Sequence, residues 1–156
     1  MSHNSRLTVA LHILSWMALA ARSGTAIATS DRIALSVNTH PVVIRRALGL
    51  LRRAGLVRVQ RGNVGGWSLA RPIDSISVLD VYRAVEPATV FALHPSPPSQ
   101  ACPVGRGIQP ALRRVYGGAA GALESELART SVADVLAETL AAGPKAGVEK
   151  KKLDRG

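Results

Sequence analysis

The chain has 156 residues, with 20 lysine or arginine residues against 10 aspartate or glutamate residues and a formal charge of +10. A hydrophobic fraction of 47% excludes a fully disordered chain, and the length suffices for about one domain with a real core. A single cysteine, Cys102, excludes an internal disulfide framework and any metal site built from several cysteines of one chain.

The positive charge is concentrated at one end of the chain. Residues 1–72 contain ten arginines and one acid, Asp31, for a charge of +9; residues 73–142 carry −2 and residues 143–156 carry +3. Such a basic segment suits nucleic acid, an anionic membrane or an acidic protein as a partner. The lysine-rich tail, residues 143–156, is predicted to be disordered.

The first predicted element covers residues 7–21, which are mostly apolar. Such a run resembles a secretory leader, but His12 and Ser15 interrupt it and 15 residues are short for a membrane span. The pattern favours a buried helix that is apolar nearly all round, in a cytoplasmic protein.

Two helices and a hairpin are predicted next. A short helix over residues 30–37, capped from within residues 29–31, is followed by a turn and a second helix that Thr39 caps and Gly55 ends. Its apolar stripe is predicted to be Val43, Ala47, Leu51 and Ala54. Strands at residues 56–60 and 67–70 flank a glycine-rich turn.

The rest of the chain is predicted to be helical around one loop. A short helix covers residues 78–85, with Ser75 or Ser77 as its cap. A proline-rich loop over residues 95–103 contains Cys102. A long helix is predicted to begin near Ile108 or Pro110 and to end near residue 128, and a last helix covers residues 132–141.

This order describes a mainly α protein with a small β-hairpin wing, that is, a winged helix-turn-helix. The second helix can enter the major groove of duplex DNA, and an arginine at the hairpin tip can reach the minor groove. The predicted DNA-binding residues, all within residues 1–72, are Ser5, Arg6, Ser30, Thr39, His40, Pro41, Val42, Arg45, Arg46, Arg61, Gly62 and Asn63. Two simpler interpretations stay open: Arg52 and Arg53 as a solvated face, and His40 as a helix cap only.

The sequence resembles the Rrf-type bacterial winged-helix regulators. The resemblance is carried by Asn38-Thr39-His40-Pro41-Val42-Val43-Ile44-Arg45-Arg46, by Leu50-Leu51-Arg52-Arg53-Ala54-Gly55-Leu56-Val57, by Arg61-Gly62-x-x-Gly65-Gly66-Trp67-x-Leu69-Ala70 and by residues 76–86. It implies a homodimer that binds a palindromic operator, usually as a repressor. It also implies that residues 73–142 sense a signal and dimerise through the long helix, by Ile108, Leu112, Val115, Ala119, Ala122 and Leu123. Three glycines of that helix, Gly117, Gly118 and Gly121, allow either close helix packing or flexibility.

The sensing region departs from the cluster-binding members of that family, which carry three cysteines there. Cys102 stands alone, so we expect no iron–sulfur cluster and no other cofactor or metal. Its thiol is either a redox sensor, activated by His94, Arg106 or the following helix, or an inert side chain. An unidentified small-molecule effector is the other candidate signal.

Two other function classes are alternatives to a specific regulator. A non-specific architectural protein that binds nucleic acid would carry the same charge. An enzyme is not expected, because the sequence shows no paired carboxylates in a plausible site, no metal-ligand spacing and no nucleophile elbow.

Overall fold

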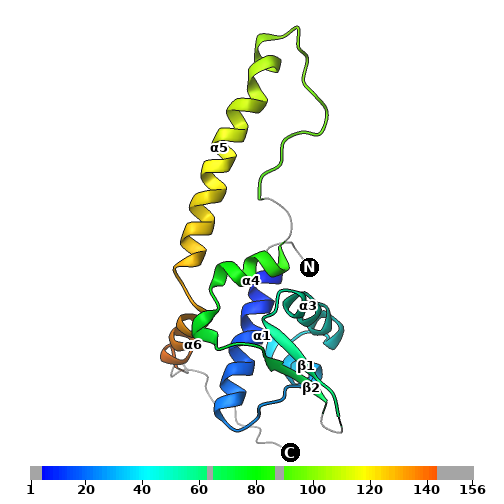
Figure 1. Cartoon of the computed structure of the whole chain (residues 1–156), viewed down its shortest axis with the longest axis vertical. Coiled ribbons are helices and arrows are strands. Elements are labelled where there is room, and N and C mark those ends of the chain that lie inside the picture. Colours follow the sequence, from blue (N-terminus) through cyan, green and yellow to red (C-terminus); the bar gives the residue numbers. More distant parts are fainter. Residues whose placement is uncertain (1–4, 63–64, 87–89, 144–156) are drawn as a thin grey trace, which may run out of the picture.

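The computed structural model describes residues 5–62, 65–86 and 90–143. A helical body holds one hairpin, and one long helix projects from it (Figure 1). The elements in chain order are α1 (Ser5–Arg22), α2 (Ser30–Val37), α3 (Pro41–Arg53), β1 (Val57–Gln60), β2 (Gly66–Leu69), a 3-10 turn η1 (Ile73–Ser75), α4 (Val78–Val85), α5 (Pro103–Ala128) and α6 (Val132–Ala141). The predicted fold class, mainly α with a β-hairpin wing, is confirmed.

The core surrounds α1, which crosses the middle of the body (Figure 1). Ile13 and Leu14 of α1 are fully buried, as are Ile33 of α2 and Ile44 of α3. The apolar run at residues 7–21 is therefore a buried helix, as its pattern predicted. Among the described residues, no helix is long and apolar enough to cross a membrane.

The helix α3 differs from its prediction in its cap and in its buried face. His40 is the N-cap, because its side chain accepts a hydrogen bond from the Val42 amide; the predicted cap, Thr39, lies one residue too early. The buried residues are Ile44, Leu48 and Leu51, so of the predicted stripe only Leu51 is fully buried. Val43 and Ala47 are half-buried, and Ala54 is exposed. Gly55 follows the helix with φ of +72°, as a residue after a helix end often does.

The hairpin is anchored to the segment that precedes α2. The two strands pair antiparallel, with Val59 opposite Trp67. Trp67 and Ala28 also exchange two backbone hydrogen bonds of 2.8 Å. A Cβ at Gly66 would lie 2.6 Å from Ile27 and 2.7 Å from the Ala28 carbonyl, so glycine is required for this close approach. The wing is therefore held at its base.

The helices α4 and α6 are joined at their N-terminal ends. The Val78 amide donates to the Thr130 carbonyl and the Val132 amide to the Ile76 carbonyl, both at 2.8 Å. Each helix begins with a capping box, Ser77 with Asp80 and Ser131 with Asp134. Ser77 is thus the cap of the 78–85 helix, one of the two residues that the sequence offered.

Hydrogen bonds at the two capping boxes affect the carboxyl groups. Burial raises the pKa of Asp80, but hydrogen bonds from Ser77 and the neighbouring Arg71 lower it by more than burial raises it. The pKa of Asp80 therefore lies below 3.8. The side chain and backbone of Ser131 lower the pKa of Asp134 below the same value. Both carboxylates are therefore stabilised in the folded protein.

The core continues past residue 72, the last residue of the predicted DNA-binding region. Ile76, Val81 and Val85 pack in the same cluster as α1 and α3, and so does Val132 of α6. The regions 1–72 and 73–142 therefore share one core. The predicted disordered tail lies outside the described residues, apart from Gly143.

The long helix begins earlier than predicted, at Pro103. Pro103 occupies the first turn, where its missing N–H costs nothing. Pro110, a predicted start, lies inside the helix. Gly105 is required because a Cβ there would overlap the Ser99 carbonyl. The helix runs unbroken through Gly117, Gly118 and Gly121, and an ion pair between Arg83 and Glu124, 2.6 Å apart, ties it to α4.

Candidate nucleic-acid interface

The site is built around the turn between α2 and α3. Asn38 ends α2 in the left-handed region, with φ of +57°, a conformation that asparagine tolerates better than most residues. The Thr39 amide then donates a hydrogen bond to the Ala34 carbonyl at 3.1 Å. A turn this tight places α2 directly against α3, which is the helix-turn-helix arrangement.

His40 fixes the first turn of α3 through one ring nitrogen. Its Nδ1 accepts from the Val42 amide at 3.2 Å, which requires that nitrogen to be unprotonated. In the neutral ring the proton then lies on Nε2, which is a donor. His40 is exposed, so the cap and a contact with DNA are compatible roles for one side chain.

The outer face of α3 carries a row of four residues opposite the core. Val42, Arg46, Gly49 and Arg53 recur at steps of four, three and four residues, which places them on one side of the helix. Both arginines are exposed and Val42 is 39% exposed. We call these four residues the outer row. Of these four residues, only Val42 and Arg46 were predicted from the sequence to bind DNA.

Arg45 lies beside the outer row and is not free. Its Nη2 is 3.7 Å from Oδ1 of Asp31, and the two side chains are 56% and 71% exposed. Asp31 is the only acid in residues 1–72. The one negative charge of the basic region thus lies against the helix that carries the outer row.

A hollow of about 730 Å³ extends from the outer row toward α1 and the end of α4. Four arginines line it: Arg6, Arg45, Arg46 and Arg53. Val9, Val43 and Val85 are among its apolar lining residues. Arg6 comes from the first turn of α1, which also contains Ser5, so the structure brings these predicted residues to the same side as α3.

The wing adds two arginines, Arg58 on β1 and Arg61 directly after it. Arg61 and Gly62 are exposed, and Gly62 has φ of +131°, a backbone conformation suited to glycine. Arg58 Nε donates to Ser68 Oγ at 3.1 Å, so the pairing strand orients its side chain. Asn63 lies outside the described residues.

The remaining predicted residues have less exposed surface. Ser30 is only 8% exposed in the first turn of α2, which leaves little of it for a DNA contact. Thr39 and Pro41 are half-buried at the start of α3. Sequence reasoning did not select Arg53 or Arg58, although the spacing from Arg46 pointed to Arg53.

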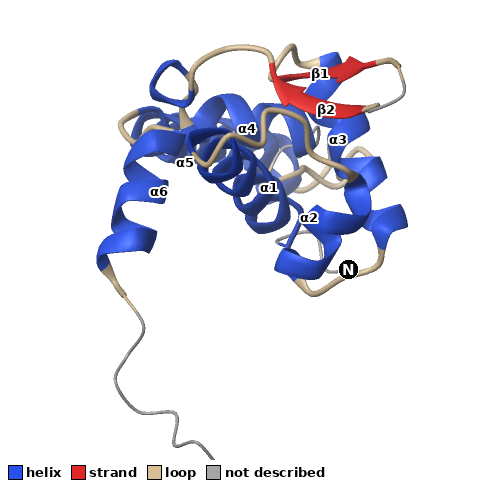
Figure 2. Cartoon of the chain, turned by 90° about the horizontal axis from the view of Figure 1, so that it is seen from below, coloured by secondary structure: helices blue, strands red, loops and turns tan. Residues whose placement is uncertain are grey.

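The helix α3 and the hairpin lie on the opposite side of the body from α6. Figure 2 shows the hairpin and α3 together on one side, with α6 on the other, and Figure 1 shows the same separation. The arginine-rich surface therefore belongs to one side of the molecule. A positively charged helix of this size beside a wing can lie against duplex DNA.

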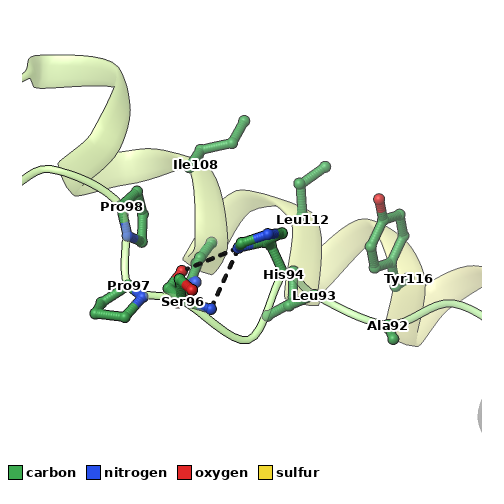
Figure 3. A pocket seen from close by; sticks show the side chains of 10 residues that line it. Ala92, Leu93, His94, Ser96, Pro97, Pro98, Ile108, Leu112 and Tyr116 are labelled. Atoms are coloured by element: carbon green, nitrogen blue, oxygen red, sulfur yellow. Dashed lines mark hydrogen bonds between the residues drawn. The ribbon is translucent and has the colours of Figure 1, made fainter.

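A second hollow, of about 550 Å³, lies between α5 and the loop that precedes it (Figure 3). His94, Pro98 and Tyr116 are among its lining residues. Phe91 stacks on Tyr116 with ring centroids 5.2 Å apart. This is the region where the sequence predicted an effector, and the structure shows a cavity there.

Cys102 is exposed and is the residue that precedes α5. The two side chains proposed to activate it bind backbone groups of the loop. His94 Nδ1 accepts from the Ser96 amide at 3.2 Å, and Arg106 Nη1 donates to the Gln100 carbonyl at 3.0 Å. A redox role for Cys102 stays a prediction.

Comparison with known sequences decides the family. The family described as "Rrf2: Iron-dependent Transcriptional regulator" matches residues 3–138. The chain belongs to the Rrf2 family. The "Putative HTH-type transcriptional regulator YwnA" of Bacillus subtilis is 43% identical over 134 residues, which cover 85% of this chain and 96% of that protein. The HTH-type transcriptional regulator IscR of Cereibacter sphaeroides is 31% identical, over 77% of each chain.

Solved structures agree with this assignment. A crystal structure of a "putative DNA binding protein" is 41% identical to this Rrf2 chain, with a TM-score of 0.67, and the match covers 85% of this chain and 99% of that one. The winged helix-turn-helix and the function class, transcription regulation, follow from the family. The named relatives are regulators, so the family gives no support for catalysis.

The family description mentions iron, but the described residues of this Rrf2 chain offer no set of ligands for an iron centre. Cys102 is its only thiol. Within residues 5–62, 65–86 and 90–143, no three histidine, cysteine, aspartate or glutamate side chains are grouped so that they could hold a metal ion. An iron–sulfur cluster needs several thiolate or imidazole ligands.

Proposed function

We propose that this Rrf2 protein is a homodimeric repressor that binds a palindromic DNA operator. The observation that carries the proposal is the outer face of α3, where Arg46 and Arg53 are exposed opposite a fully buried side. A 13-residue helix is about 20 Å long and fits the major groove. The first residues of α3, from His40 to Arg46, would meet base edges.

The wing and α1 would bind on either side of α3. Arg61, exposed beside Gly62, is suited to a narrow minor groove, where the negative potential is enhanced. Ser5 and Arg6 at the start of α1 are suited to phosphate. Asn63 is proposed to contribute at the wing tip as well.

The dimer would form through α5, which in the single chain has no fully buried residue. Val104, Ile108 and Val115 are 67%, 39% and 49% exposed, and they recur at helical spacing along one side. Leu112 and Leu123 adjoin this stripe and are half-buried. An apolar stripe on a projecting helix is stabilised when a second copy covers it, and two copies would present two recognition helices to two half-sites.

Repression and its release would follow from occupancy of the operator. We expect the protein to act in the cytoplasm, where its DNA is accessible. An effector bound in the hollow between α5 and its preceding loop would alter the dimer and so the spacing of the two recognition helices.

The test is genome-wide mapping of bound sites, followed by footprinting of the strongest site. We expect one protected palindrome and a dimeric mass in solution. Arg46→Ala and Arg61→Ala should each weaken operator binding by about 1–3 kcal/mol if each side chain reads a base. Arg129→Ala is the matched control, because Arg129 is exposed and is the C-cap of α5, next to α6. The helix α6 lies on the side of the body away from α3 (Figures 1 and 2).

Three outcomes would contradict the proposal. Equal affinity for random and genomic duplexes, with no protected palindrome, would favour the non-specific architectural protein. A monomeric mass under conditions of operator binding would remove the dimer. Loss of binding in the Arg129→Ala control equal to that in Arg46→Ala would show that only total charge matters.

A further inference from the structure

We propose that Gly49 is the point of closest approach between α3 and DNA, and that its missing side chain positions the arginines on either side of it. The proposal rests on the proposed function and deepens it. Gly49 belongs to the outer row, three residues after Arg46 and four before Arg53. It therefore lies between them on the side of α3 opposite Leu51, which is fully buried.

The fold gives no reason for a glycine at this place. Glycine is the poorest helix former after proline, and Gly49 lies in the interior of α3. A Cβ built at Gly49 would meet no atom within 4 Å. Its φ is not among the positive values that favour glycine. Neither packing nor backbone conformation therefore excludes alanine.

Other glycines of the chain show the contrast. Gly66 is required by close contact with Ile27 and Ala28, and Gly105 by contact with Ser99. Gly55 is favoured by its positive φ. Gly49 has neither reason, although it interrupts a helix that otherwise carries side chains on every side. The space above it is open in the single chain and is the space that DNA would occupy.

The width of the major groove makes the missing Cβ of Gly49 important for how closely α3 can approach DNA. An α-helix with its side chains is about 10–12 Å across, and the major groove is about 12 Å wide. The side of the helix that faces the groove floor therefore has little spare room. Without a Cβ at Gly49, the backbone of α3 can lie deeper, so that Arg46 and Arg53 reach acceptors on either side of the gap.

Gly49 is thus a positioning residue that acts through the two arginines. A deep position matters for base contacts, which need fixed distances, and matters less for phosphate contacts made by long flexible side chains. Alanine at this position should consequently reduce the preference for the operator over random DNA, in addition to reducing affinity.

The experiment compares wild type with Gly49→Ala and Gly49→Leu, both of which introduce better helix formers. Gly107→Ala is the matched control, because Gly107 also lies in a helix with no atom within 4 Å of a built Cβ. Binding is measured on a duplex that carries the footprinted palindrome and on a scrambled duplex of equal length. Thermal unfolding is measured on the same samples.

We expect Gly49→Ala to unfold at a higher temperature than wild type and yet to bind the operator at least tenfold more weakly. Gly49→Leu should bind more weakly still, and the ratio of operator to scrambled affinity should fall in both. Gly107→Ala should keep that ratio. This combination, a more stable fold with a poorer specificity ratio, is not expected of a residue with a purely structural role.

Three results would overturn the proposal. If Gly49→Ala binds the operator as wild type does, the backbone does not approach DNA closely at Gly49, while the proposed function stands. If Gly49→Ala lowers the unfolding temperature, the glycine serves the fold. If wild type itself prefers no palindrome, the proposed function fails and this inference fails with it.

Discussion

Asp31→Asn should increase DNA affinity, because it removes the acid that pairs with Arg45, which we propose to be a DNA-binding residue of α3. The Arg45–Asp31 pair is 3.7 Å long and its side chains are 56% and 71% exposed. An exposed pair of this kind is worth about 0–1 kcal/mol. Arg45 has to leave Asp31 before it can contact a phosphate or a base, so up to that amount is lost in each protomer on binding.

The expected gain follows from these values. Without this ion pair, the free energy of DNA binding should be more favourable by up to about 1 kcal/mol per protomer. This is about fivefold in affinity, or about 30-fold for a dimer with two recognition helices. The slope of log affinity against log salt should steepen by about one for each phosphate that Arg45 newly contacts. The cost to the fold should be about 0.3–1 kcal/mol, because Asp31 lies in the first turn of α2 and interacts favourably with the helix dipole.

The assay is a fluorescence-anisotropy titration of a labelled operator at several salt concentrations, together with urea unfolding. Asp74→Asn is the control, because Asp74 is exposed, lies in η1 and changes the net charge equally. Unchanged or weaker operator binding by Asp31→Asn would refute the reasoning, since it would mean that Asp31 helps to orient Arg45. An equal gain in Asp74→Asn would assign the effect to net charge alone.

Four further predictions concern the dimer, the cap, the pH dependence and the thiol. Val115→Glu should split the dimer, because it places a charge on the exposed stripe of α5; light scattering that still gives a dimeric mass would contradict this. His40→Ala should destabilise the fold by about 0.5–2 kcal/mol through loss of the cap, while His40→Asn should not; urea midpoints measure both, and an alanine variant as stable as wild type would remove the cap's role. The pKa values of Asp80 and Asp134 lie below 3.8 in the folded protein. The stability that these carboxylates contribute is therefore present above that pH and is lost as the pH falls through their folded pKa values. The corresponding asparagine variants should lose less stability between pH 7 and pH 3 than wild type, and equal losses would refute the assignment. Peroxide should change operator affinity in wild type but not in Cys102→Ser if the exposed thiol is a sensor, and unchanged binding in both would rule that role out.

The sequence predicted the elements whose signals are local. The helix over residues 30–37 and the one over residues 132–141 have the expected bounds, because capping residues and apolar spacing are read within one or two turns. The two strands of the wing differ from prediction by one residue at one or both ends. These features depend little on distant contacts.

The differences arise where distant contacts decide. The chain offers two overlapping apolar stripes on α3, and packing against α1 buries the stripe with Ile44 and Leu48 rather than the one with Val43 and Ala47. The start of α5 depends on Gly105 fitting under the Ser99 carbonyl, which no local pattern shows.

The position of α6 has a consequence for synthesis of the protein. Val132 is fully buried and Leu136 is 2% exposed, and Val132 packs in the cluster that also supports α1 and α3. A nascent chain that has emerged only as far as the wing lacks these side chains and cannot complete the core. The body that carries the outer row therefore completes its packing only after α5, the helix proposed to form the dimer, has left the ribosome.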